Sequence, residues 1–326
     1  MRIFIFLFIL FTSVTTVYAD ESGDVQALLQ KMQAAAKKEN YAGTFVLQRD
    51  GQLSASHILH RYESGDESEK IETMDGRRRE YVRHNDDALN YQPDIKTRRS
   101  EKRQVQDMFP SLLAFNNASL GEHYQLKLGQ TLRVAGVDCQ MIVILPKDQY
   151  RFGYRLCAAI PSNLLLLAQT TGLNNLILEQ IAFTTLTLGP VDDASLKSNY
   201  SDISGWKTVH DAVVVATESG WRVNALPAGF KKIREVRWPM HGNTVSSSSK
   251  NANDWQDVVQ LVYSDSLATI SVFIEPLNNL RHPRILQKGA TTISAFQFGD
   301  FWITLVGEVP VAAIKLLSDS IEYKPK

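Results

Sequence analysis

Residues 132–160 read LRVAGVDCQMIVILPKDQYRFGYRLCAAI, and this stretch decides how its part of the chain folds. It holds two apolar, strand-like runs on either side of the turn-forming PKD at 146–148. If the runs pair symmetrically about position 148, Cys139 and Cys157 lie directly opposite each other. The Cβ atoms of such neighbours are about 4.5–5.5 Å apart, which suits a disulfide. A two-residue turn would shift the register and put the thiols on opposite faces, and two buried free thiols are the other alternative.

The same hairpin predicts which side chains share a face of the sheet. Pairing about position 148 puts on one face Ile142, Ile144, Phe152, Tyr154 and Leu156. The opposite face carries apolar residues together with arginines, so neither face is simply polar. Such a sheet needs a cover on each side, or one cover and a ligand cavity. The sequence leaves both arrangements open.

Further strand candidates occur on both sides of this hairpin. Ahead of it, the hairpin-forming dipeptides Asp50-Gly51 and Asp75-Gly76 separate short runs with strand character. An amphipathic helix is predicted over residues 24–39, before the first strand. Successive hairpins with few helices favour an α+β fold built on a curved antiparallel sheet, with helices covering one face.

The chain length favours two domains, because 326 residues is about twice the usual domain size of roughly 150. A polar, turn-rich stretch at 190–220 is predicted to be the linker between them. It separates an N-terminal domain at 20–189 from a C-terminal domain at 221–326, where several strands precede a final helix.

Residues 1–19 have the layout of a signal peptide. Arg2 precedes a short apolar run, and Val17-Tyr18-Ala19 forms a small-residue cleavage site. The run is too short to span a bilayer, which takes about 20 residues, so an uncleaved anchor is the less favoured alternative. Cleavage after Ala19 predicts a soluble, exported protein. An oxidising compartment in turn favours the disulfide between the two cysteines.

The charge balance excludes one large class of function. The chain has 35 Lys and Arg against 35 Asp and Glu, whereas proteins that hold nucleic acid by bulk electrostatics need a basic excess. One local asymmetry remains, because nine basic residues between positions 77 and 103 face five acidic ones. Arg77, Arg78 and Arg79 begin this stretch. They are candidates for anion contact, and the alternative is a solvated sheet face.

The search for catalytic chemistry finds no supporting motif. The sequence lacks a nucleophile elbow, a phosphate-binding glycine loop and a zinc-binding HExxH motif. His57 and His60 are three residues apart on a predicted strand, so they face opposite sides and do not suit one metal ion. We therefore predict no catalytic residues, no cofactor and no metal site.

Several short motifs together resemble the RseB/MucB family. They are Tyr41–Val46 (YAGTFV), Asp75–Glu80 (DGRRRE), Leu132–Gly136 (LRVAG), Leu145–Leu156 (LPKDQYRFGYRL), Leu226–Phe230 (LPAGF), Ser264–Ala268 (SDSLA), Ser271–Glu275 (SVFIE) and Val306–Pro310 (VGEVP). The 145–156 block is the specific one, and the shorter fragments would be weak alone. The resemblance runs in order from about residue 25 to the C-terminus.

The resemblance implies both a fold and an activity. The fold would be an N-terminal half-open antiparallel β-barrel covered by helices, like the lipoprotein carriers LolA and LolB, with a smaller C-terminal α+β domain. The activity would be that of a periplasmic negative regulator of the sigma-E envelope-stress response. Such a regulator binds the periplasmic segment of the anti-sigma factor RseA or MucA and protects it from regulated proteolysis. Lipopolysaccharide or lipoprotein acyl chains would release it.

Taken with the residue patterns, the resemblance suggests candidate ligand residues. The amphiphile cavity would be lined by Phe45, Leu47, Ile142, Ile144, Phe152 and Tyr154, although residues of these types are more often plain core than the wall of a ligand cavity. Two other functions stay open, a periplasmic lipid or lipoprotein carrier and, less favoured, a periplasmic hydrolase. Self-association into a homo-oligomer also stays open.

Overall fold

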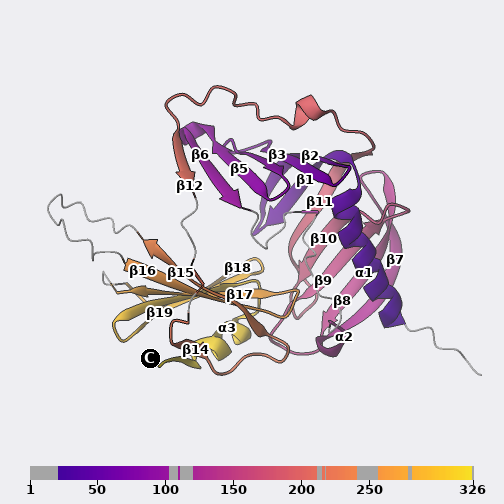
Figure 1. Cartoon of the computed structure of the whole chain (residues 1–326). Coiled ribbons are helices and arrows are strands. Elements are labelled where there is room, and N and C mark those ends of the chain that lie inside the picture. The colour runs from indigo at the N-terminus through magenta and orange to yellow at the C-terminus, as the bar shows by residue number, and fades with distance from the viewer. Residues whose placement is uncertain are drawn as a thin grey trace, which may run out of the picture.

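The computed structural model describes residues 21–102, 109–110, 120–210, 215–216, 218–240, 256–277 and 281–324. The predicted signal peptide at 1–19 lies outside these residues. Within them the chain forms two large β-sheets, one in each half of the sequence, with few helices (Figure 1). No helix in these ranges has both the length and the apolar character needed to cross a bilayer.

The first half forms a 12-stranded sheet in the order β12-β6-β5-β4-β3-β2-β1-β11-β10-β9-β8-β7. Its elements are α1 (Glu21–Lys38), β1 (Tyr41–Arg49), β2 (Gln52–Glu63), β3 (Asp66–Thr73), β4 (Glu80–His84), β5 (Asp87–Gln92), η1 (Pro93–Ile95), β6 (Thr97–Lys102), α2 (Leu120–His123), β7 (Tyr124–Val134), β8 (Val137–Pro146), β9 (Gly153–Ala159), β10 (Leu165–Thr171), β11 (Ile177–Leu188), η3 (Asp193–Leu196) and β12 (Lys207–His210). The sheet is open, because β7 and β12 are free edges among the described residues.

Local turn chemistry explains why the hairpins form where they do. Asp50 and Gly51 have φ values of 52° and 71°, the two positive values that a two-residue hairpin turn requires. Ala135 and Gly136, with φ of 49° and 80°, make the same kind of turn between β7 and β8. The predicted turn at Asp50-Gly51 is therefore confirmed.

The helix α1 closes the core of this half. Val25, Leu29 and Met32 follow helical spacing and are almost completely buried. The helix lies against β2, β7 and β10 and shares one apolar cluster with the sheet (Figure 1). Both faces of β8 are buried, as the two-sided apolar pattern of the hairpin predicts, because Met141 and Ile142 are neighbours in sequence and both belong to this cluster.

The hairpin at 137–159 contains the expected disulfide but pairs two residues away from the expected register. Cys139 lies opposite Ala159, so the bond to Cys157 is diagonal, with a Cα–Cα distance of 5.5 Å. A shift of two residues keeps both thiols on one face. The register shifts because β9 begins only at Gly153. Phe152, expected within the strand, lies in the loop before it and is buried there.

The stretch from 190 to 210 covers one side of the first sheet. Leu196 in η3 is buried, and the backbone N–H of Asn199 donates to the carboxylate of Glu80 at 3.1 and 3.2 Å. The Tyr200 ring stacks on Tyr91 with centroids 5.8 Å apart. β12 then pairs with β6 in parallel. Most of the predicted linker is thus attached to the first sheet, and the domain boundaries at 189 and 221 stay predictions.

The second half forms a 7-stranded sheet in the order β13-β15-β16-β17-β20-β19-β18, with a separate pair β14-β21. Its elements are β13 (Val215–Ala216), β14 (Trp221–Val223), β15 (Lys231–Met240), β16 (Gln256–Ser264), β17 (Thr269–Pro276), β18 (Arg284–Lys288), β19 (Thr291–Phe298), β20 (Phe301–Gly307), α3 (Val311–Ser318) and β21 (Ile321–Tyr323). Ile314 and Leu317 of α3 are fully buried against the sheet in a second apolar cluster.

Removing the disulfide should destabilise the first half measurably. The bond closes a loop with a sequence separation of 18 residues. In the chain-entropy model a loop of this size contributes about 3 kcal/mol. We expect Cys139→Ala/Cys157→Ala to lower the free energy of unfolding by that amount in urea titrations. Reduction of the wild-type protein should reproduce the loss, and an unchanged urea midpoint in both cases would contradict the prediction.

Candidate interdomain site

A buried ion pair joins the two halves of the molecule. The Arg151 Nη1 donates to Asp265 Oδ2 at 2.9 Å, and neither side chain has any exposed surface. Arg151 lies in the loop before β9, whereas Asp265 lies in the turn between β16 and β17. The Arg151 Nε also donates to Asp148 Oδ1 at 3.2 Å, which orients the guanidinium toward the second half.

The groups around this pair satisfy both partners. The Tyr124 hydroxyl donates to Asp265 Oδ2 at 2.9 Å, and Arg151 Nη2 donates to the carbonyl of Ala228. The guanidinium lies 5.3 Å from the ring centroids of both Tyr124 and Phe230, within cation–π range. Burial raises the pKa of the Tyr124 phenol well above its ordinary value, so the hydroxyl stays a donor.

The turn that carries Asp265 is held by hydrogen bonds from its own backbone. Asp265 Oδ1 accepts the backbone N–H groups of Leu267 at 3.0 Å and of Ala268 at 2.8 Å. Leu267 packs against the apolar cluster of the first half, and Tyr150 packs against that of the second. Each core therefore receives a side chain from the other half, next to the ion pair.

A second set of contacts is weaker and more exposed. Arg49 Nε contacts Glu179 Oε2 at 2.8 Å, and its Nη2 lies 4.0 Å from Glu308 of the second half. Lys288 Nζ lies 3.4 Å from Asp50 Oδ2, with about half of each side chain exposed. Exposed ion pairs of this kind contribute little to stability. Partial burial, together with nearby Glu179, raises the pKa of Glu308.

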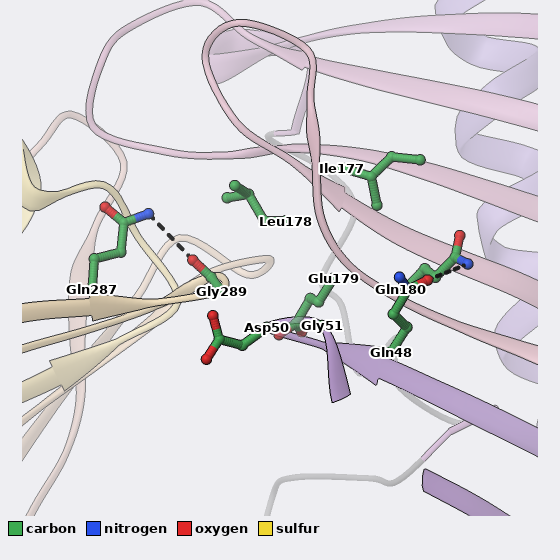
Figure 2. Close-up of a pocket in the computed structure, with 9 residues that line it drawn as sticks. All are labelled: Gln48, Asp50, Gly51, Ile177, Leu178, Glu179, Gln180, Gln287 and Gly289. Atoms are coloured by element: carbon green, nitrogen blue, oxygen red, sulfur yellow. Dashed lines mark hydrogen bonds between the residues drawn. The ribbon is translucent and has the colours of Figure 1, made fainter. Parts of the chain in front are cut away.

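A hollow of about 560 Å³ lies between the two halves beside these exposed pairs (Figure 2). It is bordered by the β1–β2 turn, the beginning of β11 and the β18–β19 turn. Its lining residues are Gln48, Asp50, Gly51, Ile177, Leu178, Glu179, Gln180, Gln287 and Gly289. Amide, carboxylate and aliphatic side chains all contribute to this lining.

Tyr154 has a buried phenol that is affected by acidic residues of the second half. Its hydroxyl is buried and has no hydrogen-bond partner among the described residues. Burial raises the pKa of Tyr154 well above its ordinary value, and Asp265 and Glu308 raise it further. The pKa of this phenol therefore depends on the buried contact at Asp265 and on the exposed contact at Glu308.

The six residues predicted to line an amphiphile cavity do not line this hollow. Phe45, Ile142 and Ile144 are buried in the first apolar cluster, where the Phe45 ring lies 5.3 Å from that of Phe109. Leu47 is half-buried on β1, Phe152 is buried in the loop before β9, and Tyr154 packs at the edge of the cluster. Their role in binding an amphiphile stays a prediction.

The three arginines predicted to contact anions are all exposed. Arg77, Arg78 and Arg79 lie in the turn between β3 and β4. Arg78 pairs with Asp94 at 3.0 Å, with 70% of its side chain exposed. None of the three lines the hollow. Anion contact stays a prediction for them.

The two histidines considered as metal ligands have separate partners. The His60 ring is fully buried, and its Nδ1 donates to the Glu39 carbonyl at 2.8 Å. Its Nε2 lies 3.3 Å from Glu67, which also accepts Arg83 Nη2 at 2.6 Å. His57 Nδ1 lies 3.3 Å from the Thr44 hydroxyl on the neighbouring strand. In the described ranges no group of three or more metal-ligating side chains comes together.

Sequence reasoning did not identify Arg151 and Asp265 as a pair. Both lie inside motifs already singled out, the 145–156 block and the 264–268 block. Their place inside these family-like motifs is the signal that could have pointed to each one separately. Their separation of 114 residues hides the partnership from any local pattern.

Two domain comparisons decide the family. The sequence model of the MucB/RseB N-terminal domain matches residues 24–200, and that of the MucB/RseB C-terminal domain matches residues 215–322. The chain belongs to the MucB/RseB family. The resemblance expected from the short motifs is thus confirmed, and it covers nearly the whole chain.

Curated relatives in this family are sigma factor regulatory proteins. The chain is 28% identical over 323 residues to the sigma factor AlgU regulatory protein MucB of Pseudomonas aeruginosa, covering 97% of this chain and 96% of the relative. It is 23% identical over 299 residues to the sigma-E factor regulatory protein RseB of Escherichia coli K12, covering 91% and 90%.

Solved structures of MucB have the same fold. MucB in complex with MucA(peri) aligns with a TM-score of 0.72 at 26% identity, over 93% of this chain and 100% of that chain. The MucA/MucB complex of Pseudomonas aeruginosa gives 0.71 at 27% identity, over 93% of this chain and 100% of that chain. MucB alone gives 0.63 at 26% identity, over 93% and 98%.

Breaking the buried ion pair should loosen the contact between the two halves. We expect Arg151→Met to cost about 3–5 kcal/mol of unfolding free energy, because it leaves the Asp265 carboxylate buried without its counter-charge. Adding Asp265→Asn should recover part of this loss, since the double variant buries no unpaired charge. Urea titration of the four proteins measures the coupling. Strictly additive losses would contradict the prediction.

The raised pKa of Glu308 predicts a pH dependence of stability. The folded protein keeps a proton that the unfolded chain has lost, so the proton stabilises the fold at low pH and this contribution is lost as pH rises. Glu308→Gln should therefore gain stability relative to wild type as the pH rises above the ordinary glutamate pKa of about 4.3. Urea midpoints at several pH values measure this gain.

Glu322→Gln serves as the matched control for this pH series. Hydrogen bonding from Asn224 lowers the pKa of Glu322, so its removal should change relative stability in the opposite direction as pH rises. A pH-independent difference between Glu308→Gln and wild type would show that Glu308 titrates normally.

Proposed function

We propose that this protein is a periplasmic negative regulator of a sigma-E-type envelope-stress response. It binds the periplasmic segment of a membrane-spanning anti-sigma factor of the RseA/MucA kind and protects that segment from regulated proteolysis. The observation that carries the proposal is the alignment with MucB bound to MucA(peri), which has a TM-score of 0.72 over 93% of this chain. The two domain matches, which together extend from residue 24 to 322, support it.

The proposal includes a location and a mode of action. The signal-peptide layout at 1–19 and the disulfide between Cys139 and Cys157 both suit an oxidising periplasm. The protein acts by binding and not by catalysis, as the names of its relatives suggest. Its first sheet is proposed to act as a half-open barrel covered by helices, in the manner of lipoprotein carriers.

The release signal is proposed to be an amphiphile, either lipopolysaccharide or lipoprotein acyl chains. The apolar side chains proposed to contact the acyl chains are Phe45, Leu47, Ile142, Ile144, Phe152 and Tyr154. Arg77, Arg78 and Arg79 are proposed to contact anionic head groups, and their exposed positions support this role.

A change in the relative orientation of the two halves would couple ligand binding to release. Among the described residues, the halves meet through the buried Arg151–Asp265 pair with its surrounding hydrogen bonds and apolar contacts, and through exposed pairs that contribute little to stability. A ligand that favours one orientation shifts the population toward it, in proportion to its differential affinity for the two orientations. MucB bound to MucA aligns better with this structure than MucB alone, which supports an orientation competent to bind the partner.

A binding assay separates this function from the alternative of a lipid or lipoprotein carrier. We expect the mature protein to capture the purified periplasmic segment of its cognate anti-sigma factor at micromolar concentration or below. Added lipopolysaccharide should weaken the capture, whereas a neutral detergent below its critical micelle concentration should not. Absence of capture at micromolar concentration would overturn the proposal. A carrier would instead extract lipid from vesicles and deliver it to an acceptor.

A further inference from the structure

The strand β18 ends the second sheet with its outer edge free among the described residues. All five of its residues are exposed, including the large apolar side chains of Ile285 at 46% and Leu286 at 53%. The neighbouring strand β19 is well covered, since Thr292 and Ser294 are buried. The exposure therefore begins abruptly at β18. A free edge presents unpaired backbone N–H and C=O groups to any extended chain that approaches it.

The other long free edge, β7, lacks these properties. Its pairing with β8 is interrupted by an irregularity between Leu128 and Thr131, and such bulges protect edges from further pairing. β18 pairs with β19 in continuous register from Arg284 to Lys288. A regular, exposed edge with apolar side chains is suited to receive another strand.

The side chains of β18 indicate the chemistry of that strand. Because side chains alternate along a strand, Arg284, Leu286 and Lys288 share one face, and Ile285 and Gln287 share the other. The strand has two basic residues and no acidic one. A complementary segment would place acidic residues opposite Arg284 and Lys288 and an apolar residue opposite Leu286, and the Lys288 ammonium would share this contact with its exposed partner Asp50. This acid–apolar–acid pattern at alternate positions reads the same in either strand direction.

The C-terminal end of β18 borders the hollow between the two halves. Gln287 and Gly289, at the end of the strand, form one wall of the hollow, and Ile177 and Glu179 form another (Figure 2). Figure 1 shows β18 on the side of its sheet that is nearest the first half. A segment added to β18 would therefore reach residues of both halves.

We propose that the free edge of β18 binds an extended polypeptide segment as an additional strand. The segment carries two acidic residues four positions apart with an apolar residue midway between them. This inference rests on the proposed function and deepens it, because it assigns the surface that the anti-sigma segment occupies. Contact with both halves at once makes the bound segment sensitive to their relative orientation.

The first test measures affinity for the periplasmic anti-sigma segment with edge variants of the full mature chain. Arg284→Glu/Lys288→Glu and Leu286→Lys should each weaken binding at least tenfold. Leu128→Lys is the matched control, since Leu128 is a partly exposed apolar residue on the interrupted edge β7, and it should bind like wild type. Unchanged urea midpoints would establish that each variant is folded. Full affinity in both β18 variants would overturn the inference while leaving the proposed function intact.

The second test examines strand addition directly and does not depend on the anti-sigma factor. A synthetic 12-residue peptide with glutamate, valine and glutamate at alternate central positions serves as the probe. It should slow amide hydrogen exchange within residues 284–288 and leave residues 124–134 unchanged. The same peptide with lysines in place of the glutamates should have no effect. Absence of protection at millimolar glutamate peptide, or protection by anionic lipid vesicles alone, would overturn the inference.

Discussion

The buried contact between Arg151 and Asp265 is the constraint on which the arrangement of this molecule depends. A guanidinium and a carboxylate have left water completely, so each needs its partner and the surrounding donors and acceptors to remain folded in place. Tyr124 and the Ala228 carbonyl supply those remaining hydrogen bonds. The buried charges are satisfied only when both halves are docked, so the two apolar cores are no longer independent of each other. An ion pair of this kind specifies orientation more than it adds stability.

The parts of the fold that could be predicted from sequence are those governed by local chemistry. Asp50-Gly51 adopts the two positive φ values of a hairpin turn, as that dipeptide predicts. The apolar spacing of α1 and the pairing of the two cysteines also follow local rules. The register of β8 with β9 differs from the prediction because Arg151 and Phe152 leave the strand before Gly153. In the loop, Arg151 contacts Asp265, which lies 114 residues away and so is outside any local pattern.

Composition gives the net charge of the chain but not the positions of its charged residues. Overall neutrality, 35 against 35, argues against bulk electrostatic attraction to nucleic acid. It does not reveal that charges are arranged by position. His60, Glu67 and Arg83 form a closed cluster inside the first sheet, whereas Arg284 and Lys288 stand on an open edge of the second. The strand order separates charges buried within the fold from charges on an open edge, where Lys288 has an exposed contact with Asp50.

The attachment of residues 190–210 to the first sheet has a mechanical consequence. β12 pairs with β6, so the covalent connection leaves from one edge of the 12-stranded sheet, whereas the Arg151 loop lies between β8 and β9 near the opposite edge. If the Arg151 contact opened, the second half would swing on its tether and would not diffuse away. Its effective concentration at the docking face would stay high, so re-docking would be an intramolecular event that is independent of protein concentration. The covalent connection between the halves therefore makes their undocking reversible.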